Sequence, residues 1–252
     1  SAAPAQSSAG AQAPSQTVRT NEDGSESVED TSGDSGTHNA MLAAVAASAQ
    51  AATTAPAKPS AWQEGVNYTR LAPAQPTSVS ADKVEVLEVF WYGCPHCYHL
   101  QPYLESWQKR KANYIVFTQV PVMWNDIHRA HARLFYTLEA LGKLPQANDA
   151  VWKEIHVAGN MLAANDPGET EAKQLEFLGR FGVSMADFKK TYRSFGVETK
   201  LQRAEELTQR YRIDGVPKFV INGKYVADVG SAQGEQKLLQ MIDDLAAQEH
   251  RH

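Results

Sequence analysis

Cys94 and Cys97 are the only cysteines in this 252-residue chain, and they stand two residues apart. Two thiols at this spacing can form a reversible disulfide, and a thiolate can attack a disulfide in another molecule. The apolar stretch 84–92 precedes the pair, and apolar residues spaced three and four apart follow it. This pattern predicts that Cys94 lies where a strand ends and a helix begins, with Pro95 in the first helical turn.

The predicted position of Cys94 has chemical consequences. A helix N-terminus carries unpaired N–H groups and a partial positive charge, and both favour a thiolate over a thiol. We therefore expect the pKa of Cys94 to be lowered, with His96 as a further stabiliser of the thiolate. Cys97 falls nearly one turn further into the helix. The sequence predicts an exposed attacking sulfur on Cys94 and a shielded resolving sulfur on Cys97.

Three other uses of the two cysteines are weaker. A structural disulfide across two residues closes so short a loop that it constrains the unfolded chain little. Zinc prefers four ligands, and only His128 and His131 could complete a set, whereas an H-x-x-H pattern on an amphipathic helix usually marks a solvated face. Covalent haem needs a histidine directly after the second cysteine, where this chain has Tyr98.

The charge of the chain is unevenly spread. The net charge is −5, and residues 1–60 hold six acidic and two basic side chains, which leaves −1 for residues 61–252. This balance gives no case for nucleic-acid binding. Residues 1–60 contain no aromatic residue and are rich in small and polar ones, so we predict a disordered low-complexity extension.

The rest of the chain predicts an α/β domain interrupted by helices. Strands are expected over 66–71 (at a sheet edge), 84–92 and 114–120, with a helix over 95–111 between the last two. A run of helices follows, including one opened by Ser184 that carries Phe188, Tyr192 and Phe195. Asn222-Gly223 then predicts a hairpin over 219–226, before a closing helix. We expect a thioredoxin-like domain of residues 61–124 and 213–249, with a helical insertion domain of residues 125–212.

These features resemble one protein family over roughly residues 62–249. Cys94-Pro95-His96-Cys97 is similar to the active-site motif of the DsbA family, which consists of bacterial periplasmic thiol:disulfide interchange proteins with a thioredoxin-like fold. Gly215-Val216-Pro217, just before the hairpin, resembles the cis-proline loop of that family. The helical insertion falls where the insertion of the family does.

The resemblance implies roles for individual residues. Cys94 would be the nucleophile and Cys97 the resolving cysteine, while Val216 and Pro217 would face the disulfide and hold substrate backbone. Glu88 matches a buried glutamate near the active site of the family.

One position departs from the family pattern. The lysine that is typical near the buried glutamate is absent, and Gln119 occupies the corresponding strand position. This difference bears on the ionisation of Glu88 and on any proton transfer from Glu88 to Cys97.

The resemblance also implies a function. The protein would donate its disulfide to exported clients, with no cofactor beyond the redox-active disulfide and with no metal. Its partners would be reduced client proteins and a DsbB-like membrane quinone reductase. We expect a monomer in the periplasm. The composition of residues 1–60 suits a tether to a membrane anchor, and it suits a dispensable tail equally well.

Two other functions remain open from the sequence. One is a reductase or isomerase of the same fold. The other is a redox-inactive chaperone or a metal-binding module that uses Cys94, Cys97 and His99.

Overall fold

The computed structural model describes residues 61–251, so the predicted disorder of residues 1–60 lies outside the described residues. Within the described range, none of the helices has the length and apolar character needed to cross a lipid bilayer.

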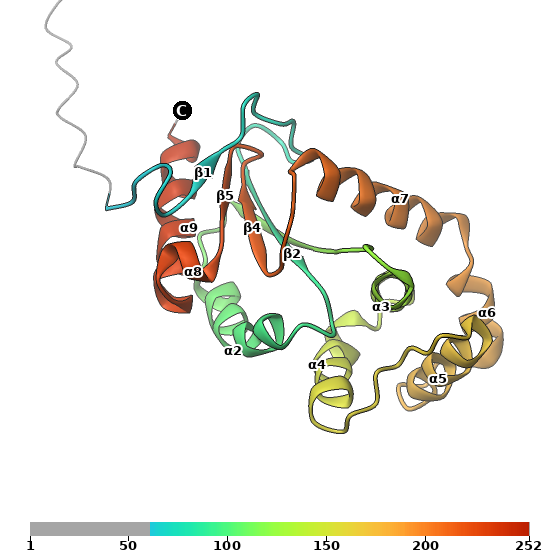
Figure 1. Ribbon diagram of the computed structural model, residues 1–252. Helices are drawn as coiled ribbons and strands as arrows, with labels where there is room; N and C mark the ends of the chain where they lie inside the picture. The colour runs from blue at the N-terminus through green and yellow to red at the C-terminus, as the bar shows by residue number, and fades with distance from the viewer. Residues whose placement is uncertain (1–60, 252) are drawn as a thin grey trace, which may run out of the picture. The chain divides into compact units, whose positions relative to one another are not determined.

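A five-stranded mixed sheet forms the centre of the described part (Figure 1). Its spatial order is β1-β5-β4-β2-β3, and only β2 and β3 pair in parallel. The strands are β1 (Thr69–Arg70), β2 (Val84–Phe90), β3 (Ile115–Pro121), β4 (Lys218–Ile221) and β5 (Tyr225–Ala227). The predicted thioredoxin-like fold is confirmed, and the first strand is an edge strand as predicted, although it is shorter than predicted.

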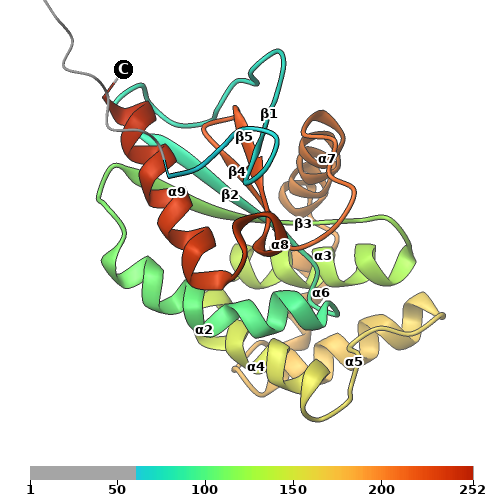
Figure 2. The same cartoon turned by 60° about the vertical axis from the view of Figure 1, so that its left-hand side comes forward.

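Helices cover both faces of the sheet, which is why all seven residues of β2 are buried. Val84 and Val86 face one apolar cluster, which is built with α2 (Pro95–Arg110) and α9 (Glu235–His250). Leu87 and Val89 face a second cluster, which includes residues of α3 (Asp126–Ala140) and α7 (Phe195–Arg210). Figure 2 shows α2 and α9 together on their face of the sheet. This alternation puts Glu88 on the side of the sheet that α2 covers.

The insertion between β3 and β4 consists of helices. Besides α3 and α7 it contains α4 (Leu144–His156), α5 (Pro167–Gly179) and α6 (Met185–Tyr192). Ser184 caps α6 by accepting from the backbone N–H of Asp187, as its position in the sequence predicts. The predicted extension of this helix to Phe195 is wrong. Ser194 caps a new helix, and Phe195, its first residue, is 86% exposed.

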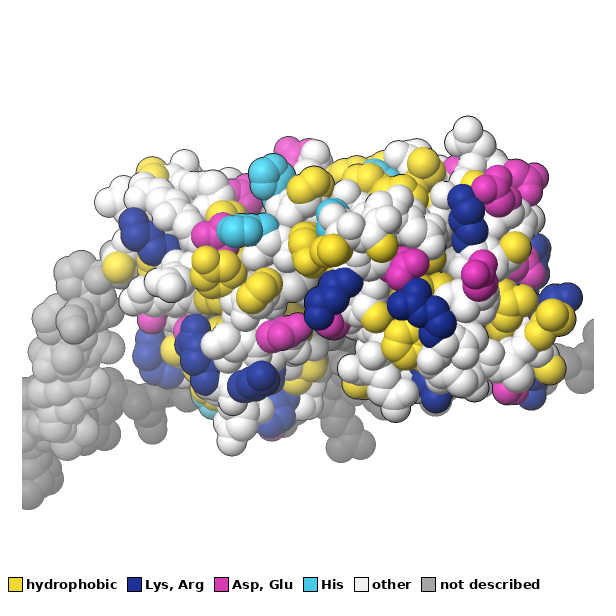
Figure 3. Space-filling model, turned by 90° about the horizontal axis from the view of Figure 1, so that it is seen from below, with side chains coloured by type: hydrophobic (Ala, Val, Ile, Leu, Met, Phe, Trp, Pro, Cys, Tyr) yellow, Lys and Arg dark blue, Asp and Glu magenta, His cyan; other side chains and the backbone are white. Residues whose placement is uncertain are grey.

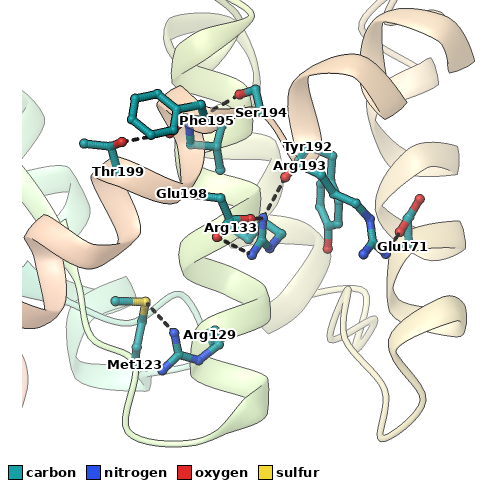
Figure 4. A network of polar contacts seen from close by, with 11 residues as sticks. Met123, Arg129, Arg133, Glu171, Tyr192, Arg193, Ser194, Phe195, Glu198 and Thr199 are labelled. Carbon is teal, nitrogen blue, oxygen red and sulfur yellow. Dashed lines mark hydrogen bonds and ion pairs between the residues drawn. The ribbon is translucent and has the colours of Figure 1, made fainter. Parts of the chain in front are cut away.

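Arg133 joins three helices of the insertion (Figure 4). From α3, its guanidinium donates to the carbonyl of Tyr192 at the end of α6, at 2.8 Å. It also donates to both carboxylate oxygens of Glu198 on α7, at 2.5 and 3.1 Å. A paired, two-point contact of this kind fixes direction as well as distance. The neighbouring Arg129 makes only longer contacts, at 3.9 Å to the sulfur of Met123 and at 3.5 Å to Glu205.

The predicted hairpin turn is confirmed. Asn222 and Gly223 both have positive φ, at 50° and 62°, which a two-residue turn of this kind requires. Gly223 also allows a close approach, because a Cβ there would lie 2.1 Å from the carbonyl oxygen of Gln75. A short helix, α8 (Val229–Ala232), links the hairpin to α9.

Candidate active site

Cys94 is the N-cap residue of α2, as the sequence predicts. Its backbone is extended (φ −81°, ψ 118°), Pro95 occupies the first helical turn, and its sulfur accepts from the backbone N–H of Cys97 at 3.4 Å. Side chains at this position commonly accept from the third helical residue. Here the acceptor is a sulfur, so the cap directs backbone donors at the reactive atom.

The pKa of Cys94 is lowered to about 6. The largest cause is a hydrogen bond from the Cys97 thiol, and burial acts in the opposite direction. Backbone hydrogen bonds from Cys97 and His96 lower it further, and the charge of the His96 ring contributes least of these. Both cysteines are free thiols in the structure. The predicted lowering is therefore present, and backbone and thiol donors contribute more to it than the imidazole.

Cys97 is fully buried, with none of its surface exposed. Burial raises its pKa far above that of a free thiol, so it stays protonated where Cys94 is ionised. Cys94 is only 6% exposed, so the expectation of an openly exposed sulfur is wrong. The reason is the loop before β4, where the carbonyl of Val216 lies 3.6 Å from the Cys94 sulfur.

The loop at Val216 and Pro217 adjoins an open cavity. The peptide bond between them is cis, as the resemblance implies. The cavity beside them has a volume of about 330 Å³, and its other lining residues include His96, His99 and Glu235. Figure 3 shows the end of the molecule that lies lowest in Figure 1, where histidine and hydrophobic side chains lie next to one another. A substrate chain could therefore lie along this loop beside Cys94.

Glu88 is buried beneath the site and is paired in register with Gln119 of β3. The Gln119 amide donates to Oε2 of Glu88 at 2.7 Å, while Oε1 has no hydrogen-bond partner. Burial, opposed by that single hydrogen bond, raises the pKa of Glu88 to about 7. The strand register thus puts Gln119 directly beside Glu88 on the neighbouring strand. Because burial outweighs the Gln119 hydrogen bond, Glu88 keeps its proton to a higher pH than an exposed glutamate does.

His128 and His131 do not form the solvated face that their spacing suggested. They are 8% and 1% exposed, because the Trp91 ring from the active-site loop packs against them. His99, exposed on α2, lies 3.5 Å from Glu235. Among residues 61–251, no group of three histidine, cysteine or acidic side chains is arranged to hold a metal ion.

Sequence reasoning missed Trp91 as a residue of the site. It precedes the motif by three positions, and its ring lies over Gly93. The signal that could have found it is the tryptophan itself, standing between a buried strand and the first cysteine. An aromatic residue in that place must pack on something outside the strand.

A family model described as a DSBA-like thioredoxin domain matches residues 111–243. The thiol:disulfide interchange protein DsbA of Azotobacter vinelandii is 38% identical over 185 residues, which is 73% of this chain and 83% of that protein. The chain belongs to the DsbA family.

Other DsbA proteins show the same relationship. The DsbA of Burkholderia cepacia is 37% identical over 198 residues, covering 79% of this chain and 91% of that protein. The crystal structure of Pseudomonas aeruginosa DsbA superposes with a TM-score of 0.69 at 34% identity, covering 75% of this chain and 95% of that one. Oxidoreductase DsbA from Xylella fastidiosa also gives a TM-score of 0.69, at 27% identity, over 76% and 99% of the two chains.

Membership of the DsbA family makes this chain a thiol:disulfide oxidoreductase. The range that matches the DsbA-like model includes Val216 and Pro217, but it begins after Cys94 and Cys97. The roles of the two cysteines therefore rest on their geometry.

Proposed function

We propose that the oxidised protein donates its Cys94–Cys97 disulfide to reduced, exported client proteins through a mixed disulfide at Cys94. The observation that carries this proposal is the unequal setting of the two sulfurs. Cys94, at the helix cap, has a pKa of about 6 and lies beside the Val216 loop, whereas Cys97 is fully buried. A stabilised thiolate favours the reduced enzyme, and hence oxidation of the client.

The reaction proceeds in two exchanges. A client thiolate attacks the sulfur of Cys94, a client–Cys94 disulfide forms, and Cys97 leaves and takes up a proton. A second client thiolate then attacks the client sulfur of the mixed disulfide and releases Cys94 as a thiolate. The client loses two electrons and the enzyme disulfide gains them.

The neighbouring residues position the reacting groups. The backbone at Val216 and Pro217 holds the client chain in an extended form, and Pro95 begins the helix that aims N–H groups at Cys94. His96 adds its own N–H and a modest charge. Glu88, whose pKa burial raises to about 7, exchanges a proton with Cys97 as that sulfur leaves. Burial and the Cys94 hydrogen bond raise the Cys97 pKa most, and the further influence of Glu88 on that pKa supports this role.

The cellular setting belongs to the same proposal. The protein acts in the periplasm as a monomer, needs no cofactor beyond its disulfide, and is reoxidised by a DsbB-like membrane quinone reductase. Residues 61–124 with 213–249 form the thioredoxin-like domain and residues 125–212 the helical insertion domain. Residues 1–60 act as a tether outside the catalytic part, so their deletion should leave exchange in solution unchanged.

Trapping of the mixed disulfide tests the mechanism. In the Cys97→Ala variant, Cys94 can attack an oxidised client, but no internal thiol can release it, so covalent complexes should accumulate. These complexes should disappear on reduction, and they should be absent from the matched Cys94→Ala variant. Covalent complexes in the Cys94→Ala variant, which would have to form through Cys97, would contradict the assignment of Cys94 as the reactive sulfur. The absence of complexes in the Cys97→Ala variant would contradict it as well.

A further inference from the structure

The Trp91 ring packs against the active-site loop. A Cβ built on Gly93 would lie 2.3 Å from Cζ2 of Trp91, so the ring occupies the space directly over the residue before Cys94. The Trp91 backbone reaches both cysteines. Its carbonyl accepts from the N–H of Cys94 at 3.0 Å. Burial, the largest influence on Cys97, raises the pKa of that thiol, and a hydrogen bond from the Trp91 backbone lowers it.

His131 holds this ring by a hydrogen bond. Its Nδ1 lies 2.9 Å from the indole Nε1 of Trp91, and its Nε2 lies 2.6 Å from the carbonyl oxygen of Met161. An indole nitrogen only donates and a carbonyl only accepts. The imidazole must therefore be neutral, with its proton on Nε2. Protonation of Nδ1 would place its N–H donor opposite the indole N–H donor of Trp91, and the hydrogen bond would be lost.

The surroundings of His131 favour that neutral form. Burial lowers its pKa to about 4, and the neighbouring imidazoles of His128 and His156 add to the lowering. The Tyr92 ring from the active-site loop also faces it, with 6.3 Å between ring centroids. At neutral pH the two hydrogen bonds are therefore intact.

The far end of this chain of hydrogen bonds is itself fixed. Met161 belongs to the segment between α4 and α5, and its neighbour Leu162 is fully buried. The buried Gln174 donates to the carbonyls of Ala130 and Leu162, at 3.1 and 2.9 Å, and so joins that segment to α3. His131 thus connects the active-site loop to a fixed part of the helical insertion.

We propose that His131 is a positioning residue for disulfide exchange: by holding Trp91 over Gly93, it fixes the loop in which backbone N–H groups point at the Cys94 sulfur. This inference rests on the exchange reaction proposed above. Loss of the His131–Trp91 hydrogen bond lets the loop move, so the backbone N–H groups are directed at the Cys94 sulfur for a smaller fraction of the time. The thiolate is then less stabilised, and the enzyme becomes a weaker oxidant.

Two variants and their combination test the hydrogen bond. His131→Phe and Trp91→Phe each keep an aromatic ring and remove one partner. Each should raise the Cys94 pKa, followed by thiolate absorbance, and should shift the equilibrium constant with glutathione roughly two- to tenfold toward the disulfide form. The double variant should shift it no further than the larger single change, because both remove the same bond.

A matched control separates positioning from packing. His128 lies 4.2 Å from the Trp91 ring, centroid to centroid, but its Nδ1 has no hydrogen-bond partner. His128→Phe should therefore leave the Cys94 pKa and the glutathione equilibrium as in the wild type. His131→Asn puts an acceptor oxygen near the place of Nδ1. It should therefore reverse most of the change in Cys94 pKa and in the glutathione equilibrium that His131→Phe causes.

The inference is overturned if His131→Phe and Trp91→Phe lower resistance to urea while leaving the Cys94 pKa and the glutathione equilibrium unchanged. An equal effect of His128→Phe would also overturn it. Trp91 is only half-buried, so we expect the Trp91→Phe variant to fold. It therefore still tests the proposal if His131→Phe does not fold. A wild-type protein that fails to exchange with glutathione would instead defeat the proposed function.

Discussion

Cys97 donates to Cys94 through both its backbone and its side chain. Its N–H lies 3.4 Å from the Cys94 sulfur, and its thiol is the largest cause of the lowered Cys94 pKa. The residue that leaves when the disulfide is attacked therefore stabilises the thiolate that remains at the end of the reaction. Release of Cys97 and stabilisation of Cys94 are two consequences of one arrangement at the start of α2.

The first prediction concerns the source of the Cys94 thiolate stabilisation. Cys97→Ala should raise the Cys94 pKa above its value of about 6, and it should do so more than His96→Ala, because the thiol donor contributes most and the His96 charge least. Thiolate absorbance against pH measures both. A larger effect from His96→Ala would show that the imidazole charge dominates.

The second prediction concerns stability of the reduced form against pH. The folded pKa of Cys94 is lowered to about 6, so the added stability is fully present above the unfolded thiol pKa of roughly 8.5 and is lost as the pH falls through 6. Urea unfolding of reduced and oxidised protein at pH 5, 7 and 8.5 should show that the free energy of unfolding of the reduced form increases relative to that of the oxidised form as the pH rises. A pH-independent difference would contradict the stabilised thiolate.

The third prediction concerns Glu88. Its folded pKa is raised to about 7, so ionisation of the unfolded chain lowers stability as the pH rises from about 4.3 to 7. Glu88→Gln should remove this loss and stabilise the protein at pH 8 by about 2 to 4 kcal/mol. The gain should vanish near pH 4. Urea unfolding of both proteins at the two pH values measures it, and equal stability at pH 8 would show that Glu88 is ionised without penalty.

The fourth prediction concerns Arg133 in the helical insertion. Arg133→Met should destabilise the protein by about 1 to 3 kcal/mol, because it removes hydrogen bonds to Tyr192 and Glu198. Arg129→Met, one turn away on the same helix, should change stability by less than about 0.5 kcal/mol. Arg133 also lowers the Glu198 pKa, so its contribution should fall in acid, as the pH drops through that lowered value. Equal losses of unfolding free energy in the two variants would mean that the contacts of Arg133 with Tyr192 and Glu198 add nothing to stability.

Local patterns in the sequence predicted the order of strands and helices along the chain, the helix cap at Cys94 and the hairpin turn. Each depends on neighbouring residues: a buried strand, a proline in the first turn, and Asn222-Gly223 at positive φ. Gln119 was matched to Glu88 through the resemblance to the DsbA family, and the register of β2 and β3 shows that the two residues are neighbours.

The misassigned residues depend on contacts between distant segments. His128 and His131 are buried by Trp91, about forty positions earlier, which helical spacing alone cannot reveal. The limited exposure of Cys94 comes from Val216, which is 122 positions away. Phe195 continues the spacing of Phe188 and Tyr192, but the cap at Ser194 starts a new helix and turns Phe195 outward.

The reduction potential of the Cys94–Cys97 pair tests the central claim most directly. The claim is that the folded protein stabilises the Cys94 thiolate and so favours the dithiol form. Equilibration with glutathione near neutral pH should place the pair well above about −270 mV, the potential of a thioredoxin-type reductant, and above the glutathione couple itself. A potential at or below that of thioredoxin would contradict the account and would indicate a reductase.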